Sequence, residues 1–174
     1  MPTPPTSSRS HDPRRGIRRT AAGLIGVCGV YQAAIGLYFM ALRPAMLPED
    51  VRFLGIDVMR LYASLPRLET WLHLVFVVLG GQMAAVGALV VGSSLRIFQA
   101  QLRNRHEVAW LGAAGLLSVG TMSAVNFALQ SDFRWLLIAP GLAWAVGLVL
   151  ALASCRTVAG VAGDSGRTAS RGMT

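Results

Sequence analysis

The chain has 174 residues, of which 53% are hydrophobic and only 14% are charged, whereas a soluble domain carries about 25% charged residues. The net charge of +8 comes from sixteen arginines without a single lysine. These arginines lie at the ends of apolar runs, where they act as topology signals. The composition therefore excludes a nucleic-acid partner and predicts an integral membrane protein whose main contact is the lipid bilayer.

The first 20 residues are rich in proline, serine and arginine and show no apolar period, so residues 1–20 are expected to form a disordered cytoplasmic tail. An apolar run over 21–42 follows. It is long enough to cross a hydrocarbon core of about 30 Å. A basic segment before an apolar run is also typical of a signal peptide, but this run is too long and no small-residue cleavage site follows. We expect an uncleaved transmembrane helix.

The loop between the first and second apolar runs is too long for a simple turn. It contains Pro48, Glu49 and Asp50, which are typical of a helix start. Apolar residues then recur at spacings of three and four, which predicts one amphipathic helix over about 48–65. This helix would cap the bundle or lie at the membrane surface. A gating or partner-docking role is the alternative.

Three further apolar runs predict transmembrane helices over about 71–95, 108–129 and 135–154. Residues 155–174 are small and polar and are expected to form a second disordered cytoplasmic tail. The predicted fold class is therefore all-α. It consists of one transmembrane domain over 21–154, with four helices in an antiparallel bundle.

The distribution of arginines predicts the orientation. Eleven of the sixteen lie in the two tails and the middle loop, and five lie in the other two loops. Because basic residues accumulate on the cytoplasmic side, both termini are expected in the cytoplasm. The absence of lysine is typical of a GC-rich bacterial coding bias, so the predicted location is a bacterial inner membrane.

Each predicted helix places small residues on one face, and two of the helices also place an amide there. Small residues mark faces where two membrane helices approach closely, and amides form hydrogen bonds across such contacts. The residues predicted to pack helices together are Gln32, Gly29, Gly36, Gly80, Ala84, Gly112, Gly115, Ala143 and Gly147.

His73 shares the small face of its helix with Gly80 and Ala84, which predicts that its side chain points into the bundle. By their positions in the runs, His73, Asn126 and Tyr38 all lie about 4–6 Å below the outer interface. If they converge, they form a polar pocket that opens outward and binds a small hydrophobic molecule such as a quinone or a lipid. Interhelical hydrogen bonding is the alternative role for His73 and Asn126, and interfacial anchoring is the alternative for Tyr38.

No aspartate, glutamate, lysine or arginine occurs within the core of any predicted span, which argues against a proton- or ion-coupled transporter. The segment LLSVG around Ser118 lacks the first glycine of a serine-hydrolase elbow. No metal-ligand spacing is present, so no metal, cofactor or catalytic residue is predicted. Enzymatic activity is left open, with the balance against it.

Three segments carry a likeness to a known group. They are FLGID after the first helix, FVVLGGQMAAVGALVV in the second and RWLLIAPGLAWAVGLVL in the fourth. In layout, residues 21–154 resemble small bacterial four-helix inner-membrane proteins of the broad DoxX-like type. Some members of that type are accessory subunits of quinone-linked oxidoreductases, so the resemblance implies a similar role. It implies no functional residue, because the shared patterns contain only glycine and apolar residues.

Two functions therefore follow from the sequence. The first is a non-enzymatic accessory or structural subunit, which associates with another membrane protein or with itself. The second is a binder or carrier of a small hydrophobic molecule in the outer pocket.

Overall fold

The computed structural model describes residues 13–99, 105–132 and 134–170, with side chains described for 14–99, 105–132 and 134–155. Within these residues all regular structure is helical. Four helical segments are long and apolar enough to cross a membrane: Arg14–Ala41, Leu68–Phe98, Arg105–Ala128 and Arg134–Cys155. The predicted all-α, four-span fold class is confirmed, and the chain is a multi-pass membrane protein.

The elements in chain order are α1 (Pro13–Ala41), α2 (Pro48–Leu54), α3 (Val58–Ser64), α4 (Leu68–Phe98), α5 (Arg105–Gly115), the π-helical turn η1 (Leu116–Gly120), α6 (Thr121–Ala128), the 3-10 turn η2 (Arg134–Leu137) and α7 (Ile138–Ser170). The third span is thus α5, η1 and α6 in succession. The fourth span is η2 followed by α7.

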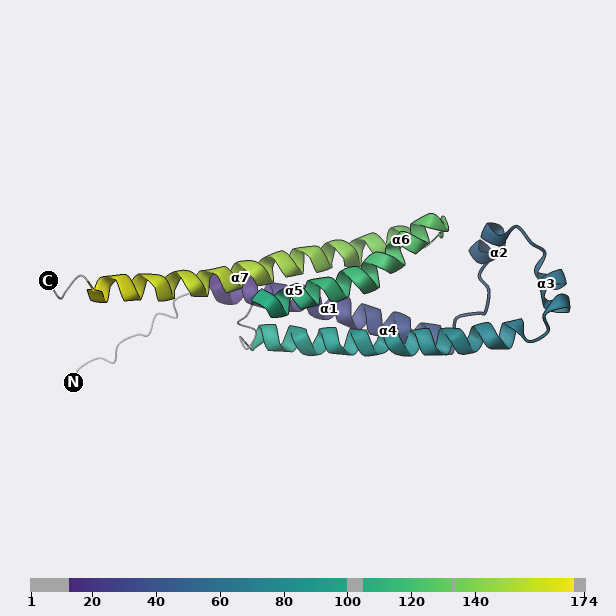
Figure 1. Ribbon diagram of the computed structural model, residues 1–174, viewed down its shortest axis with the longest axis horizontal. Coiled ribbons are helices and arrows are strands. Elements are labelled where there is room, and N and C mark those ends of the chain that lie inside the picture. The colour runs from purple at the N-terminus through teal and green to yellow at the C-terminus, as the bar shows by residue number, and fades with distance from the viewer. Residues whose placement is uncertain (1–12, 100–104, 133, 171–174) are drawn as a thin grey trace, which may run out of the picture.

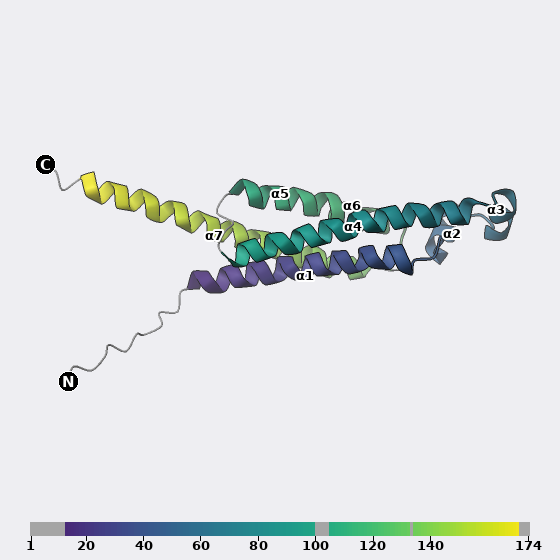
Figure 2. The ribbon, with the colours of Figure 1, turned by 90° about the horizontal axis from the view of Figure 1, so that it is seen from below.

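The spans form an elongated bundle in which α1 contacts both α4 and α7 (Figures 1 and 2). One side of α1 packs along α4, and another side packs along α7. The third span packs mainly against α7. The short helices α2 and α3 lie beyond the end of α1, at the end of the bundle where α4 begins (Figure 1).

The contact between α1 and α4 brings backbone against backbone at glycines. A methyl group on Gly36 would lie 2.5 Å from the backbone nitrogen of Ala84, and one on Gly80 would lie 2.5 Å from the carbonyl oxygen of Gly36. Further along the helices, a methyl group on Gly87 would lie 2.7 Å from the carbonyl oxygen of Gly29. Only hydrogen fits at these positions, and this is how small residues let two membrane helices approach closely.

Glycines on the other side of the bundle receive side chains. A methyl group on Gly147 of α7 would lie 2.9 Å from Cγ1 of Ile25, which is fully buried. Gly115 of α5 lies directly against the indole ring of Trp144. The remaining predicted packing residues in this half of the bundle are half-buried: Gly112, beside Leu148, and Ala143.

Both ends of the predicted transmembrane domain differ from the sequence-based boundaries. Helix α1 begins at Pro13 rather than Ala21, because proline is well suited to the first helical position. Helix α7 continues to Ser170, where a disordered tail from residue 155 was predicted. No proline follows Pro140, so no residue there removes a backbone donor and stops the helix. Residues 1–12 and 171–174 of the two predicted tails lie outside the described residues.

The first outer loop contains two short helices instead of the single predicted helix over 48–65. The break is at Gly55, whose φ of 63° is left-handed and ends α2. Asp57 then begins α3 by accepting a hydrogen bond from the backbone nitrogen of Met59 at 2.9 Å. The apolar stripe predicted from the spacing is therefore divided between two helices.

We predict that Gly80→Ala destabilises the protein, whereas the neighbouring substitution Gly81→Ala does not. The methyl group on Gly80 meets the backbone of α1, which cannot move aside locally, so a loss of about 1–3 kcal/mol is expected. A methyl group on Gly81 meets nothing within 4 Å and adds helix propensity. Thermal unfolding in detergent, followed by circular dichroism, measures both. Equal effects of the two substitutions would contradict the glycine contact.

Candidate functional site

The register of α1 and α4 determines where His73 lies. The two helices are antiparallel and place Gly36 beside Gly80, so His73 is level with Arg43. By then α1 has ended, at Ala41. His73 lies on the face predicted for it, but the neighbouring helix stops before reaching it. Its side chain is therefore exposed and faces the turn after α1, not the interior of the bundle.

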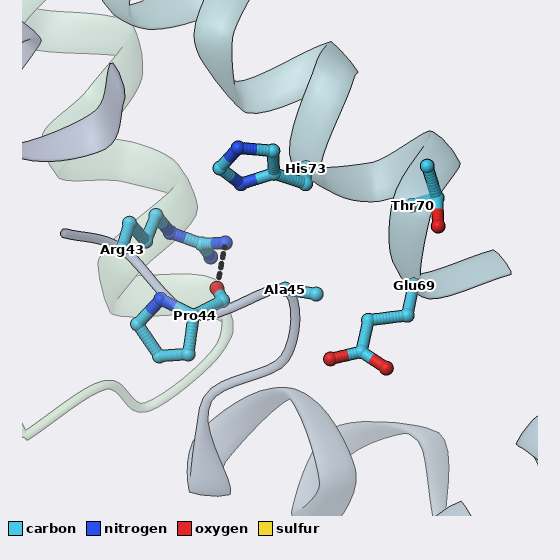
Figure 3. A pocket seen from close by; sticks show the side chains of 6 residues that line it. All are labelled: Arg43, Pro44, Ala45, Glu69, Thr70 and His73. Atoms are coloured by element: carbon cyan, nitrogen blue, oxygen red, sulfur yellow. Dashed lines mark hydrogen bonds between the residues drawn. The ribbon is translucent and has the colours of Figure 1, made fainter. Parts of the chain in front are cut away.

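His73 lines an open depression of about 340 Å³ at this end of the bundle. The turn after α1 forms one wall through Arg43, Pro44 and Ala45. The first turns of α4 form the other wall through Glu69, Thr70 and His73. Figure 3 shows the His73 ring and the Arg43 guanidinium toward one end of the depression and the Glu69 carboxylate toward the other. The depression thus combines cationic, imidazole, hydroxyl and carboxylate groups.

Arg43 is held more firmly than any of its neighbours in the depression, with a side chain only 8% exposed. Its guanidinium lies 3.6 Å from the ring centroid of Phe76 and 5.0 Å from that of Phe39. It donates to Oδ2 of Asp50 at 3.4 Å and to the carbonyl oxygen of Pro44 at 3.2 Å. Burial lowers the pKa of the Arg43 guanidinium, and the Asp50 carboxylate opposes that shift. The buried Nε has no acceptor among the described residues.

The same end of the bundle carries contacts between the two outer loops. Ser131, buried after α6, donates from Oγ to Oε1 of the buried Glu49 at 3.2 Å. Arg52 forms an ion pair with Asp132 at 3.2 Å, but both side chains are largely exposed. Through these contacts α2 is attached to the turn after α6, which fixes the loop that lies beside the depression.

The other two predicted pocket residues lie elsewhere. The ring of Tyr38 is exposed and packs edge-on against Phe39, with centroids 6.1 Å apart. Nδ2 of Asn126 donates to the backbone oxygen of Met122 at 2.9 Å, within its own helix. Neither residue lines the depression that contains His73. That the three residues bind one ligand together stays a prediction.

A second polar contact lies deep in the bundle. Ser118, in the π-helical turn η1, donates from Oγ to Oε1 of the buried Gln32 at 3.4 Å. On the same face of α1, the Cys28 thiol donates to the carbonyl oxygen of Pro140 at 3.4 Å. These contacts join α1 to the third and fourth spans. A π turn widens the helix locally and often accompanies a functional site, but this one has the more direct role of presenting Ser118 to Gln32.

The charged residues of the site were not predicted from the sequence: Arg43 and Glu69, which line the depression, and Asp50, which pairs with Arg43. Glu69 had a usable signal, because it precedes His73 by four residues and therefore shares its helix face. Arg43 was interpreted only as a topology signal, and Asp50 only as a helix-start residue. The stacking of Arg43 on Phe76 had no local signal, since Arg43 lies in the turn after the first span and Phe76 lies in the second span.

Among the residues that the structure describes, no three histidine, cysteine, aspartate or glutamate side chains are grouped as metal ligands would be. Comparison of the chain with protein-family models, curated proteins and solved structures returned no match. The resemblance to DoxX-like proteins therefore stays a prediction.

We predict that Arg43→Ala destabilises the fold by about 2 kcal/mol, because it leaves Asp50 without its partner and removes the cation from two aromatic rings. Arg52→Ala is the matched control. Its ion pair with Asp132 is 60% and 74% exposed, so its loss should cost less than about 1 kcal/mol. Unfolding in detergent measures both variants. A larger effect at Arg52 than at Arg43 would contradict this ranking.

Proposed function

We propose that this protein is a non-enzymatic accessory or structural subunit of a bacterial inner membrane that associates with another membrane helix through the exposed side of α4. The observation that carries the proposal is an unused stripe of small residues, hereafter the α4 stripe. It consists of Gly81, Ala85, Ala88 and Gly92. Their spacing of four, three and four places them on one helix face.

The α4 stripe is distinct from the small residues that contact α1. Methyl groups on Gly81 and Gly92 would meet nothing within 4 Å, and Ala85 and Ala88 are exposed. The α1 contact uses Gly80 and its neighbours on another side of the same helix. Because small residues mark membrane helix contacts, a second such face indicates a partner helix outside this chain.

Gln82 is a polar residue on the exposed surface of α4, about 90° around the helix from the α4 stripe. It lies near the midpoint of the helix, where the hydrocarbon core surrounds the span, and its side chain is exposed. None of the described residues forms a hydrogen bond with its amide. An amide that faces lipid without a partner is unfavourable, whereas an amide at a helix–helix contact finds one.

The orientation and location in this proposal rest on the arginine distribution and the coding bias. The greater number of arginines on the side of the two tails supports cytoplasmic termini. The resemblance to the DoxX-like type supports an accessory role beside an oxidoreductase. Neither argument depends on the α4 stripe, so the stripe and the orientation are tested separately.

Native mass spectrometry after gentle extraction tests the association. We expect a dimer or a stoichiometric second polypeptide, and expect Gly81→Leu with Ala88→Leu to dissociate it. The matched control is Gly23→Leu on α1, where a side chain also enters open space. Gln82→Leu should weaken association by about threefold, since a membrane hydrogen bond is worth about 0.6 kcal/mol. A wild-type protein that is stable, monomeric and without any partner would count against the proposal.

Binding of a small hydrophobic molecule, such as a quinone or a lipid, is the second candidate function. The depression beside His73 favours it, because polar groups gather there at the end of two apolar spans. We expect His73→Ala to reduce the amount of co-extracted molecule severalfold. His106→Ala, which changes a histidine in the first turn of α5 at the opposite end of the bundle, is the control. Unchanged retention in His73→Ala would remove His73 from the site.

A further inference from the structure

The depression beside His73 offers both donors and an acceptor to one ligand. Arg43 and His73 supply N–H donors, and Glu69 supplies a carboxylate. Thr70, which lies between Glu69 and His73 in the sequence, adds a hydroxyl group. Figure 3 shows the carboxylate away from the guanidinium and the imidazole, so the two kinds of group line different parts of the same depression.

This arrangement of charge selects against simple ions. A ligand that carries only negative charge would approach Glu69 unfavourably, and one that carries only positive charge would approach Arg43 unfavourably. Asp50 already pairs with Arg43, so a purely anionic ligand gains less from Arg43 than a free guanidinium would offer. A ligand with both charges, at separate atoms, matches both parts.

The position of the depression relative to the spans indicates where such a ligand comes from. The first span ends at Ala41 and the second begins at Leu68, so the depression lies at the level where phospholipid headgroups meet water. Further along α4, on the side of the helix turned away from α1, large apolar side chains that include Leu74 and Val78 are exposed. An open depression of about 340 Å³ admits a headgroup while acyl chains remain along α4.

We propose that this depression binds the headgroup of a zwitterionic phospholipid that carries a phosphate and a primary ammonium. The phosphate contacts Arg43 and His73, and the ammonium contacts Glu69. Arg43 is suited to this task because Phe76, Phe39 and Asp50 hold its guanidinium in place before the lipid arrives. The inference rests on the second function proposed above and names its ligand class.

The test compares two lipids with identical acyl chains, phosphatidylethanolamine and phosphatidylglycerol, added in equal amounts to delipidated full-length protein. Native mass spectrometry measures how much of each is retained. We expect the wild type to retain severalfold more phosphatidylethanolamine. Glu69→Gln should abolish this preference while both lipids still bind, because the groups that contact the phosphate remain. His73→Ala should lower the retention of both lipids.

Asp132→Asn is the control, since this carboxylate lies at the same end of the bundle but outside the depression. It should keep the wild-type preference. Equal retention of the two lipids by the wild type would overturn the proposal, as would an unchanged preference in Glu69→Gln. Glu69 is exposed in the first turn of α4, so Glu69→Gln should fold like the wild type. Circular dichroism checks that the helical content of the variant is unchanged.

Soluble glycerophosphoethanolamine, which has the same charges without acyl chains, distinguishes the source of the ligand. If it displaces the lipid at similar concentration, the site serves a soluble phosphate ester and the lipid proposal is overturned. Failure to displace supports a membrane lipid. Native extraction that instead retains a quinone would overturn this inference but leave the second function standing. Extraction that retains no small molecule would overturn both.

Discussion

The close antiparallel approach of α1 and α4 determines the positions of the other parts of this molecule. At Gly36 and Gly80 there is room only for hydrogen between the two backbones, and the same holds at Gly29 and Gly87. Contacts at separate points along the helices admit a single register. Sliding either helix by one residue would place side chains where only hydrogen fits. The site at the end of the bundle follows from this register.

That register explains why His73 faces a loop. The helix face of His73 continues the small face that packs on α1, yet α1 ends at Ala41 and the chain turns away through Arg43. A histidine on a packing face therefore becomes a histidine in an open depression. The same turn brings the Arg43 guanidinium over Phe76 of α4. One register thus places a cation, an imidazole and a carboxylate around one hollow.

The two halves of the bundle are built differently, which bears on function. The α1–α4 contact is backbone to backbone, whereas α7 and the third span meet through side chains such as Trp144 against Gly115. A hydrogen bond donated by Ser118 to Gln32 connects the halves inside the bundle. Helix α4 has α1 on one side and the unused α4 stripe on another. Helix α4 thus has two faces of small residues, and only one of them packs on another helix of this chain. Such a helix is well suited to an accessory subunit.

The sequence by itself determined the number of spans, their class and the residues that allow close packing. Hydrophobic run length and helical periodicity are local properties, and the bilayer imposes both. It also contained a signal for Glu69, at four residues from His73. Helix boundaries were less accurate, because Pro13 and residues 155–170 are compatible with helix outside the apolar runs. Gly55 divided the loop helix through a left-handed conformation that periodicity does not report.

Only the tertiary structure decided which polar residues meet. The positions of Tyr38, Asn126 and His73 within their apolar runs predict similar depth, but they leave open the direction in which each side chain points and where its neighbour ends. The Asn126 side chain donates to the backbone of its own helix. His73 lines the same depression as Arg43, because the glycine contact between α1 and α4 sets the register. Such pairings depend on the relative position of two helices, and no local pattern in either one contains that information.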